Sequence, residues 1–247
     1  MIDMTGSKVV VTGAAGGLGS MVVKRLGGLG AEVFAIDQNA SSSQDSMTYS
    51  AHFDLGRPSG IGDAVQAISQ VFSHVDLLVN CAGAFLPDPS PDEVHSAFDH
   101  LWRNNTSSTV LLTLGLEPLL RASSGASVVN IGSTDGIVAS GGQECEIGVS
   151  HDVLYAVSKG AVIAFTRALA MKWCKLGIRV NTICPTVFPS PMTESLLTDR
   201  KVAELSRHIP LGRLGHIDDV VDAVIFAHHM KFTTGHVFPV DGGYLCQ

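Results

Sequence analysis

The sequence predicts an α/β fold, a single domain in which a doubly wound parallel sheet carries helices on both faces. Three observations predict it. The chain has 247 residues, 45% of them hydrophobic and only 16% charged, a composition that can bury a large core. Short strand-like segments alternate with longer helical ones along the whole chain. The strand-like segments are apolar on both faces, which is typical of a parallel sheet covered on both sides.

The expected elements follow this alternation from one end of the chain to the other. Short apolar segments bounded by turn residues predict strands, at Lys8–Val11, Glu32–Ile36, Asp76–Asn80, Ser127–Ile131, Arg179–Ile183 and His236–Val240. A further strand is expected to end at Asp54. Helices are expected between the strands, near Leu18–Leu29, Ile61–Phe72, Asp92–Leu120, Val153–Trp173 and Ile217–His229.

Composition argues against several classes of function. The net charge is -7 and no basic cluster occurs, so we expect no nucleic-acid partner. The 5 cysteines form no CxxC pair, which suits reduced thiols in the cytoplasm. His228 and His229 are adjacent and no HExxH motif occurs, so we expect no metal. No uninterrupted apolar stretch of about 18 residues and no signal peptide are found, so we expect no membrane span.

The first predicted strand leads directly into the glycine-rich segment TGAAGGLGS. Gly13, Gly17 and Gly19 would permit a tight turn, close approach of the backbone to a pyrophosphate, and close packing of helix on strand. The following helix would direct its amino-terminal N–H groups at the phosphates. A glycine cluster alone is weak evidence, but its strand–turn–helix setting predicts a dinucleotide-binding fold of the Rossmann type.

Two aspartates follow the next strands. Asp37 closes the second strand about 20 residues after the glycines, where a carboxylate accepts the ribose hydroxyls of NAD and repels the 2′-phosphate of NADP. No Arg or Lys stands in the glycine segment or just after Asp37, so the sequence favours NAD. Asp54 is placed to accept the adenine amino group, although a turn-forming aspartate explains it nearly as well.

Five motifs in order resemble the short-chain dehydrogenase/reductase family in its single-domain form, from Lys8 to Gly243. TGAAGGLG resembles TGxxxGxG, NCAG resembles NNAG, and YAVSK matches YxxSK. RVNTICP resembles RVNxIxP, and GHVFPVDGG resembles the family's closing TGxxxxVDGG. The resemblance implies that residues 1–247 form one dinucleotide-binding and catalytic domain.

The resemblance implies four catalytic residues. Two of them are Tyr155 and Lys159. The third is a serine just after the fifth strand, Ser133, with Thr134 as the alternative. The fourth is an asparagine, Asn105, with Asn104 as the alternative. Lys159 lies one helical turn from Tyr155, and its charge would lower the pKa of a phenol that ordinarily titrates near 10. Ser133 would donate to the carbonyl oxygen, and Asn105 would anchor a water in the proton relay.

The resemblance also implies a set of cofactor-binding residues. Lys159 would hold the nicotinamide ribose, Ser190 would take the place of the family's threonine at the carboxamide, and Val187 or Phe188 would lie against the ring. The expected NAD-binding set is Gly13, Ala15, Gly17, Leu18, Gly19, Asp37, Asp54, Leu55, Asn80, Ala82, Gly83, Tyr155, Lys159, Pro185, Val187, Phe188 and Ser190.

Two further departures from the family pattern lie close to the expected site. A threonine follows Pro185 where the family has glycine. The segment between Ser133 and Tyr155 is longer than is typical and contains Glu144, Glu146, His151 and Asp152. Long loops beside a reaction centre usually shape the substrate site. We therefore expect the substrate loops at about 134–154 and 186–212.

These features predict an NAD-dependent oxidoreductase that interconverts a secondary alcohol and a ketone by hydride transfer, with Tyr155 as the general acid/base. The alternative within the class is an NAD-using 3-oxoacyl or hydroxysteroid reductase. The alternative from another class is a catalytically silent NAD-sensing protein. The long helices are apolar on more than one face, which predicts a homodimer or homotetramer.

Overall fold

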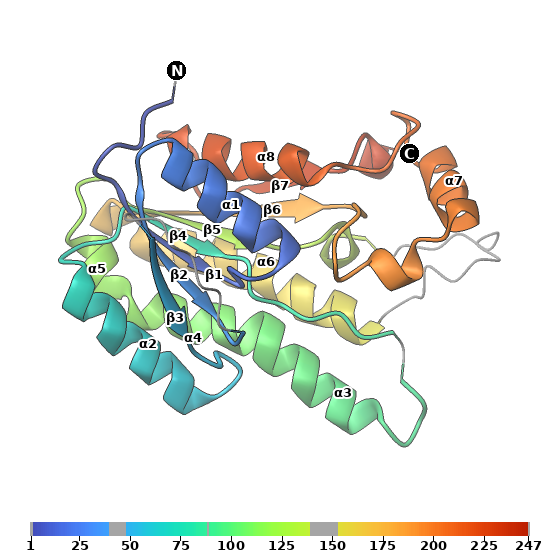
Figure 1. The fold of residues 1–247 in the computed structure, drawn as a ribbon, viewed down its shortest axis with the longest axis horizontal. Coiled ribbons are helices and arrows are strands. Elements are labelled where there is room, and N and C mark those ends of the chain that lie inside the picture. The colour runs from blue at the N-terminus through green and yellow to red at the C-terminus, as the bar shows by residue number, and fades with distance from the viewer. Residues whose placement is uncertain (1, 40–47, 88, 139–152, 247) are drawn as a thin grey trace.

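A computed structural model describes residues 2–39, 48–87, 89–138 and 153–246. Its centre is one sheet of seven parallel strands in the order β3-β2-β1-β4-β5-β6-β7 (Figure 1). The strands are β1 (Lys8–Thr12), β2 (Glu32–Asp37), β3 (Thr48–His52), β4 (Leu77–Asn80), β5 (Ser127–Ile131), β6 (Arg179–Pro185) and β7 (Val237–Val240). The expected doubly wound single domain is confirmed.

The strand order reverses between β1 and β4. The chain builds outward from β1 through β2 to β3, then returns to pair β4 with the other side of β1. Strands β5, β6 and β7 follow in sequence on that side. In such sheets the loops at the carboxyl ends of strands diverge at the reversal and leave a crevice for a ligand. The reversal therefore locates the expected site.

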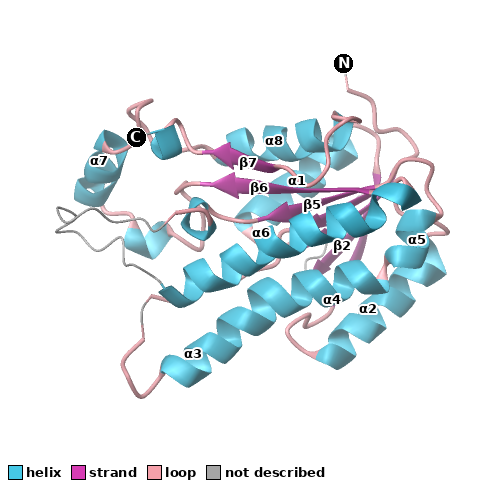
Figure 2. Ribbon diagram, turned by 180° about the vertical axis from the view of Figure 1, so that it is seen from behind, coloured by secondary structure: helices cyan, strands magenta, loops and turns pink. Residues whose placement is uncertain are grey.

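Helices cover both faces of the sheet (Figure 2). Helices α1 (Gly17–Gly28) and α8 (Ile217–His229) pack together on one face. The other face carries α2 (Pro58–Val71), α4 (Ser108–Gly115) and α6 (Val153–Trp173), with α3 (Val94–Leu101) and α5 (Glu117–Arg121) continuous with that layer. Helix α7 (Asp199–Arg207) lies beyond β6, within the predicted substrate segment.

The sheet divides the core into two clusters because successive side chains of a strand point to opposite faces. In β1, Val10 belongs to the cluster beneath α2, α4 and α6. Its neighbours Val9 and Val11 belong to the cluster beneath α1 and α8. All three are fully buried. This double burial explains why the strands are apolar without alternation.

The helical segment expected over Asp92–Leu120 is present, with local changes in its winding. A π-helical turn, Trp102–Ser107, joins α3 to α4, and Leu116 lies between α4 and α5. Pro118 is accommodated because it lies in the first turn of α5, where no backbone donor is needed. The strand expected to end at Asp54 ends two residues earlier, because β3 stops at His52. The boundaries of the other predicted elements agree within a few residues.

One helix among the described residues, Val153–Leu176, is long and apolar enough to cross a membrane by length and composition. This segment consists of α6 and the short helical turn that follows it, and α6 packs against β5 and β6. A buried core helix passes the same test, so the expected absence of a membrane span stays a prediction.

Candidate active site

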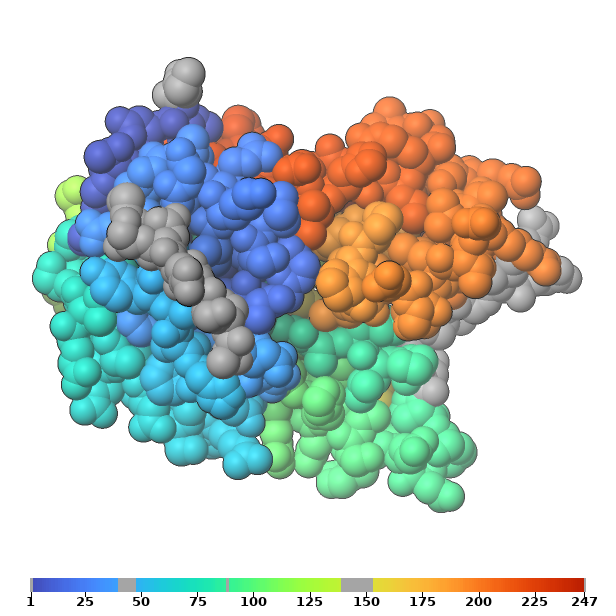
Figure 3. Space-filling view, in the orientation of Figure 1, coloured from blue at the N-terminus to red at the C-terminus, as the bar shows by residue number. Residues whose placement is uncertain are grey.

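The candidate site lies at the carboxyl ends of β1, β4, β5 and β6. On the face shown in Figure 3, the amino-terminal segment that carries the glycine turn meets the segments that follow β4 and β6. Gly13 has a φ of 65°, and a Cβ there would lie 2.9 Å from the backbone of Ala82. The turns after β1 and β4 therefore touch through backbone alone, and only glycine fits.

The other two glycines bring further segments together. A Cβ on Gly19 would lie 2.1 Å from the carbonyl oxygen of Gly13. A Cβ on Gly17 would lie 2.7 Å from Cδ of Pro191 and 3.5 Å from Cβ of Ser190. The predicted pyrophosphate turn and the predicted nicotinamide segment after β6 are thus in direct contact.

Asp37 lies beside the glycine turn and is hydrogen-bonded to it. Its Oδ2 accepts a hydrogen bond from the backbone N–H of Ala15 at 2.9 Å, and its Oδ1 accepts one from Asn39 at 2.8 Å. A carboxylate oxygen can accept more than one bond, so both oxygens keep capacity for ribose hydroxyls. The position fits the predicted role.

The first turn of α1 supplies free backbone donors. Its N-cap, Gly16, makes no side-chain cap. Within the part of the chain that the structure describes, no acceptor is bonded to the N–H of Gly17 or Leu18. Such orphan donors at a helix amino terminus bind anions. These residues fit the diphosphate of a dinucleotide cofactor.

Tyr155 and Lys159 occupy the first two turns of α6. Lys159 is 5% exposed, and its Nζ donates to the carbonyl oxygen of Ile131 at 3.0 Å. Nζ lies 5.7 Å from the centroid of the Tyr155 ring. The ring of Tyr155 packs edge-on against Phe85, with centroids 5.3 Å apart. The predicted proton-transfer pair is therefore assembled in the fold.

The described residues place no carboxylate in an ion pair with Lys159. No ion pair to Lys159 occurs among the described residues. Burial lowers the pKa of Lys159 to about 8, so the cation still predominates at neutral pH. Burial raises the pKa of the neighbouring thiols of Cys81 and Cys184 to about 12, so both remain uncharged. The field of Lys159 is thus available to stabilise a phenolate.

Ser133 follows β5 and is 7% exposed. Its Oγ accepts from the backbone N–H of Asp135 and donates to Asp135 Oδ2, both at 3.2 Å. The short helical turn that it caps, Thr134–Gly136, packs on α6, where a Cβ on Gly136 would lie 2.8 Å from the backbone of Lys159. Ser133 therefore caps a turn, and that turn is held beside Lys159.

Asn105 and Asn104 lie in the π-helical turn and point in different directions. Asn105 is 1% exposed. A Cβ on Gly83 would lie 3.1 Å from Asn105 Oδ1 and 3.4 Å from Lys159 Nζ, so both atoms border the same small space. Asn104 instead donates to the carbonyl oxygen of His100 and lies beside Gly56. The geometry places Asn105, not Asn104, next to Lys159.

The side chain of Asn105 has no donor left for a water. Its Oδ1 accepts from the N–H of Ala84, and both Nδ2 hydrogens are used, toward the carbonyl oxygen of Ala84 and Oγ of Ser158. Its backbone carbonyl accepts from Thr109 Oγ1. The predicted water-anchoring role stays a prediction, and the contacts that the structure describes are those of a clamp.

Three members of the expected cofactor set direct their side chains elsewhere. Asn80 is buried and donates to Thr113 Oγ1 and Asn130 Oδ1. Leu55 belongs to the core. Asp54 accepts from the N–H of Gly56 and pairs with Arg57 at 3.0 Å, which is the turn-forming alternative. A cofactor contact from Asn80 or Leu55 would come from backbone atoms.

Sequence reasoning missed two polar residues of the site. Thr12 Oγ1 accepts from the N–H of Ala82 and fastens the β4 turn to β1. Thr193 Oγ1 bonds to the hydroxyl and N–H of Ser190 and to the carbonyl oxygen of Phe188. Thr12 opens the glycine motif, so the motif could have indicated it. Nothing in the local sequence indicates Thr193.

The predicted substrate segments are only partly described. Residues 139–152, with Glu144, Glu146, His151 and Asp152, lie outside the described residues. The second segment contains a short helical turn, Glu194–Leu196, followed by α7. Among the described residues no group of three or more His, Cys, Asp or Glu side chains could hold a metal ion.

Comparison with known proteins bears on this arrangement. A family model described as enoyl-(acyl carrier protein) reductase matches residues 13–245. A rhamnolipid-biosynthesis 3-oxoacyl-[acyl-carrier-protein] reductase of Pseudomonas aeruginosa is 31% identical, over 98% of this chain and 97% of its own length. An NAD-dependent glycerol dehydrogenase of Listeria innocua is 27% identical, over 98% of this chain and 95% of its own.

Solved structures agree with the fold. The Pseudomonas aeruginosa RhlG/NADP active-site complex matches with a TM-score of 0.84 at 31% identity, over 98% of this chain and 97% of that one. A short chain dehydrogenase family protein of Francisella tularensis matches with a TM-score of 0.84 at 26% identity, over 98% and 99%.

The fold and the assembled side chains define a class, the oxidoreductases that use a nicotinamide cofactor. The chain belongs to the short-chain dehydrogenase/reductase family. Members of that family bind a nicotinamide cofactor, act on small molecules and are commonly oligomeric.

Proposed function

We propose that this protein interconverts a secondary alcohol and a ketone with NAD, with Tyr155 as the general acid/base. The observation that carries the proposal is the buried Lys159 cation, 5.7 Å from the centroid of the Tyr155 ring and without a carboxylate partner among the described residues. A cation held in this way favours ionisation of a nearby phenol toward the pH at which an acid/base works best.

The chain's own residues have distinct roles in this proposal. A bound nicotinamide would supply the hydride acceptor or donor. Tyr155 would take the proton from the alcohol, or return it to the ketone oxygen, at its phenolic oxygen. Lys159 would stabilise the phenolate. Ser133 would donate to the substrate oxygen where charge develops, exchanging its present bond to Asp135 Oδ2 for that one.

The preference for NAD over NADP rests on Asp37. Its carboxylate lies at the glycine turn through Ala15, where a 2′-phosphate would meet negative charge. Relatives named for either cofactor occur, a glycerol dehydrogenase for NAD and the RhlG complex for NADP. The Asp37 position therefore carries this part of the proposal.

A second candidate is reduction of a 3-oxoacyl group. It is favoured by 31% identity to the 3-oxoacyl-[acyl-carrier-protein] reductase over nearly the full length of both chains. The chemistry at Tyr155 would be the same, and only the substrate carried to it would differ.

The experiment is a panel of substrates assayed with NAD and NADP separately, by the absorbance of the reduced cofactor. The panel contains secondary alcohols, sugar alcohols, 3-hydroxysteroids and a 3-hydroxyacyl thioester, with the matching ketones run in reverse. Turnover of a secondary alcohol is expected with NAD. Cofactor binding by calorimetry without turnover across the panel would instead favour the NAD-sensing alternative.

The cofactor preference has its own test. Asp37→Ala is expected to weaken NAD binding and to reduce its preference over NADP about tenfold, because a hydrogen-bonded charge contributes about 1.5–3 kcal/mol. Asp37→Asn is the matched variant, since it removes the charge but keeps one acceptor for the turn. An unchanged ratio of the NAD and NADP dissociation constants in both variants would contradict the role of Asp37.

We also propose a homodimer or homotetramer in the cytoplasm. Val94, Phe98 and Trp102 form an exposed apolar stripe along α3 and the π-helical turn, with the rings of Phe98 and Trp102 stacked at 5.8 Å. Burial of such a stripe against a second copy would remove apolar surface from water. Sedimentation of the wild type and of Trp102→Glu tests this: the variant is expected to dissociate.

The location in the cytoplasm is supported by the cysteines. The free thiols of Cys81, Cys174, Cys184 and Cys246 suit a reducing compartment.

A further inference from the structure

Ser158 lies between the two residues of the proton-transfer pair, three positions after Tyr155 and directly before Lys159. It is 1% exposed. Its Oγ donates to the carbonyl oxygen of Tyr155 at 2.7 Å and accepts from Nδ2 of Asn105 at 2.9 Å. A serine that bonds back to its own helix is common. The second bond, from a different element, is what sets Ser158 apart.

The π-helical turn holds Ser158 at two points. Asn105 bonds its hydroxyl, and the next residue, Thr106, donates from Oγ1 to its backbone carbonyl at 3.0 Å. A π-helical turn shifts the side chains that follow it relative to a regular helix, and such turns are frequent at functional sites. Here the turn directs two consecutive side chains at one residue of α6.

Asn105 extends the connection to the loop after β4. Its amide bonds both the N–H and the carbonyl oxygen of Ala84, at 2.7 and 3.0 Å. Because the N–H of Ala84 needs an acceptor, the side-chain atom of Asn105 facing it must be the oxygen. The other atom is then the nitrogen, which donates to Oγ of Ser158. Ser158 in turn must direct its own hydrogen at the carbonyl oxygen of Tyr155. Each bond thus orients the next, and such chains are mutually strengthening.

We propose that Ser158 is a positioning residue for the proton-transfer pair, joining the first turns of α6 through Asn105 to the loop after β4. The proposal rests on the proposed function of Tyr155 and Lys159. Tyr155 is the third residue of α6, and terminal helical turns fray unless other contacts hold them. The clamp fixes the backbone at Tyr155 and Ser158, and hence the separation of the phenol from the ammonium group.

The test is the ionisation of Tyr155, followed by the ultraviolet difference absorbance of tyrosinate in the intact protein, with and without NAD. The chain has 3 tyrosines, so subtraction of the Tyr155→Phe titration isolates the signal of Tyr155. Ser158→Ala is expected to raise the Tyr155 titration midpoint by about half a pH unit, because Coulomb attraction weakens with distance. Ser158→Ala should also lower kcat about tenfold and move the pH profile of kcat upward by about the same half pH unit.

Three further variants control the experiment. Ser158→Thr keeps the hydroxyl and should restore the wild-type midpoint. Ser127→Ala removes another fully buried serine hydroxyl, bonded to His228 at the opposite end of β5, and should leave the midpoint unchanged. Thr106→Val removes only the bond to the carbonyl of Ser158 and should shift the midpoint in the same direction, less far. It serves if Ser158→Ala does not fold.

The outcomes separate this inference from the proposed function. If the wild-type Tyr155 titrates near 10, as a free tyrosine does, the pairing with Lys159 is absent and both proposals fail. If the wild-type midpoint is lower, but neither Ser158→Ala nor Thr106→Val moves it, Ser158 is an ordinary helix residue and only the positioning role is overturned.

Discussion

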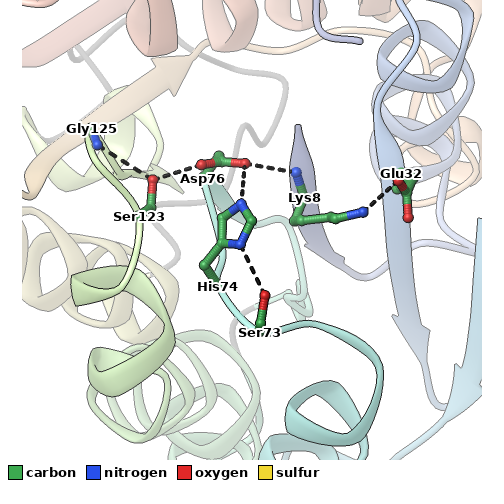
Figure 4. A network of polar contacts seen from close by, with 7 residues as sticks. All are labelled: Lys8, Glu32, Ser73, His74, Asp76, Ser123 and Gly125. Carbon is green, nitrogen blue, oxygen red and sulfur yellow. Dashed lines mark hydrogen bonds and ion pairs between the residues drawn. The ribbon is translucent and has the colours of Figure 1, made fainter. Parts of the chain in front are cut away.

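Two opposite ends of the strands can be compared: the amino-terminal ends, here called the amino-terminal edge of the sheet, and the carboxyl ends, here called the carboxyl edge. At the amino-terminal edge Asp76 is surrounded by hydrogen-bond donors, whereas at the carboxyl edge Lys159 has no charged partner among the described residues. Asp76 accepts from the N–H of Lys8 at 2.8 Å and from Ser123 Oγ at 2.6 Å, and lies 3.4 Å from His74 Nε2 (Figure 4). The ammonium group of Lys8 pairs with Glu32 in the same network.

Arg179, also at the amino-terminal edge, follows the same rule. Its guanidinium donates to the carbonyl oxygens of Ala227, His228 and Met230. These are carbonyls at the end of α8, where a cation is favoured by the helix dipole. The partly buried charges at this edge are hydrogen-bonded or paired, and they therefore stabilise the fold. At the carboxyl edge the charge on Lys159, which has no ion-pair partner among the described residues, is costly to the fold, and in the proposed function it stabilises the phenolate.

The largest expected effect comes from removing the phenol at the carboxyl edge. Tyr155→Phe should lower kcat about 10³-fold, because the general acid/base is lost, with the melting temperature and NAD affinity nearly unchanged. Steady-state kinetics and thermal unfolding measure the two. Tyr49→Phe, on β3 and 43% exposed, is the matched control and should keep full activity. A variant lacking the Tyr155 hydroxyl that still turned over at the wild-type rate would rule out its role.

Lys159→Met should separate stability from activity. Removing the buried cation should lower kcat about 100-fold and raise the free energy of unfolding by about 1 kcal/mol, since an apolar chain of similar length relieves an unpaired buried charge. Urea unfolding and kinetics on the same preparation check both. Should the variant be less stable than the wild type, the bond to the Ile131 carbonyl outweighs the cost of burial, and the comparison of the two edges is wrong.

Asp76→Asn should have the opposite signature at the other edge. The amide presents a donor toward groups that are already donors, so we expect a loss of about 2 kcal/mol in the free energy of unfolding, with kcat unchanged. Asp99→Asn breaks a surface pair with Arg103 at 3.5 Å and should cost less than about 0.5 kcal/mol. Equal losses in the two variants would show that the Asp76 network adds no stability.

The smallest expected effect is a pH dependence that comes from His228. Burial lowers the pKa of His228 to about 3, below the value of about 6.5 in an unfolded chain. Between these values the unfolded state binds a proton that the folded state does not, so stability falls as the pH drops. From pH 6 to 5 the loss should be about 1 kcal/mol. His228→Gln should reduce that slope in urea unfolding; an unchanged slope would mean that His228 is protonated in the folded protein.

The sequence predicted the strands and the ends of α6 because each depends on local patterning. Val9, Val10 and Val11 are apolar without alternation, and that alone indicates a strand covered on both faces. The glycine turn could also be predicted from local sequence. Gly13 adopts a positive φ and lies against the backbone of Ala82, and both features require glycine. The helical segment expected over Asp92–Leu120 is present, but its π-helical turn at Trp102–Ser107 was not predicted, because apolar periodicity does not distinguish one π-helical turn from the α-helix around it.

By itself the sequence therefore determined the fold class, the family and the identity of the candidate proton-transfer pair. Only the tertiary structure decided between Asn105 and Asn104, since both have the same chemistry and differ only in the direction in which they point. It also placed Thr193 beside Ser190 and joined Ser158 to Asn105 across 53 residues of sequence. These contacts link residues that are distant along the chain, and their partners are chosen by the packing of α6 against the π-helical turn and the loop after β4.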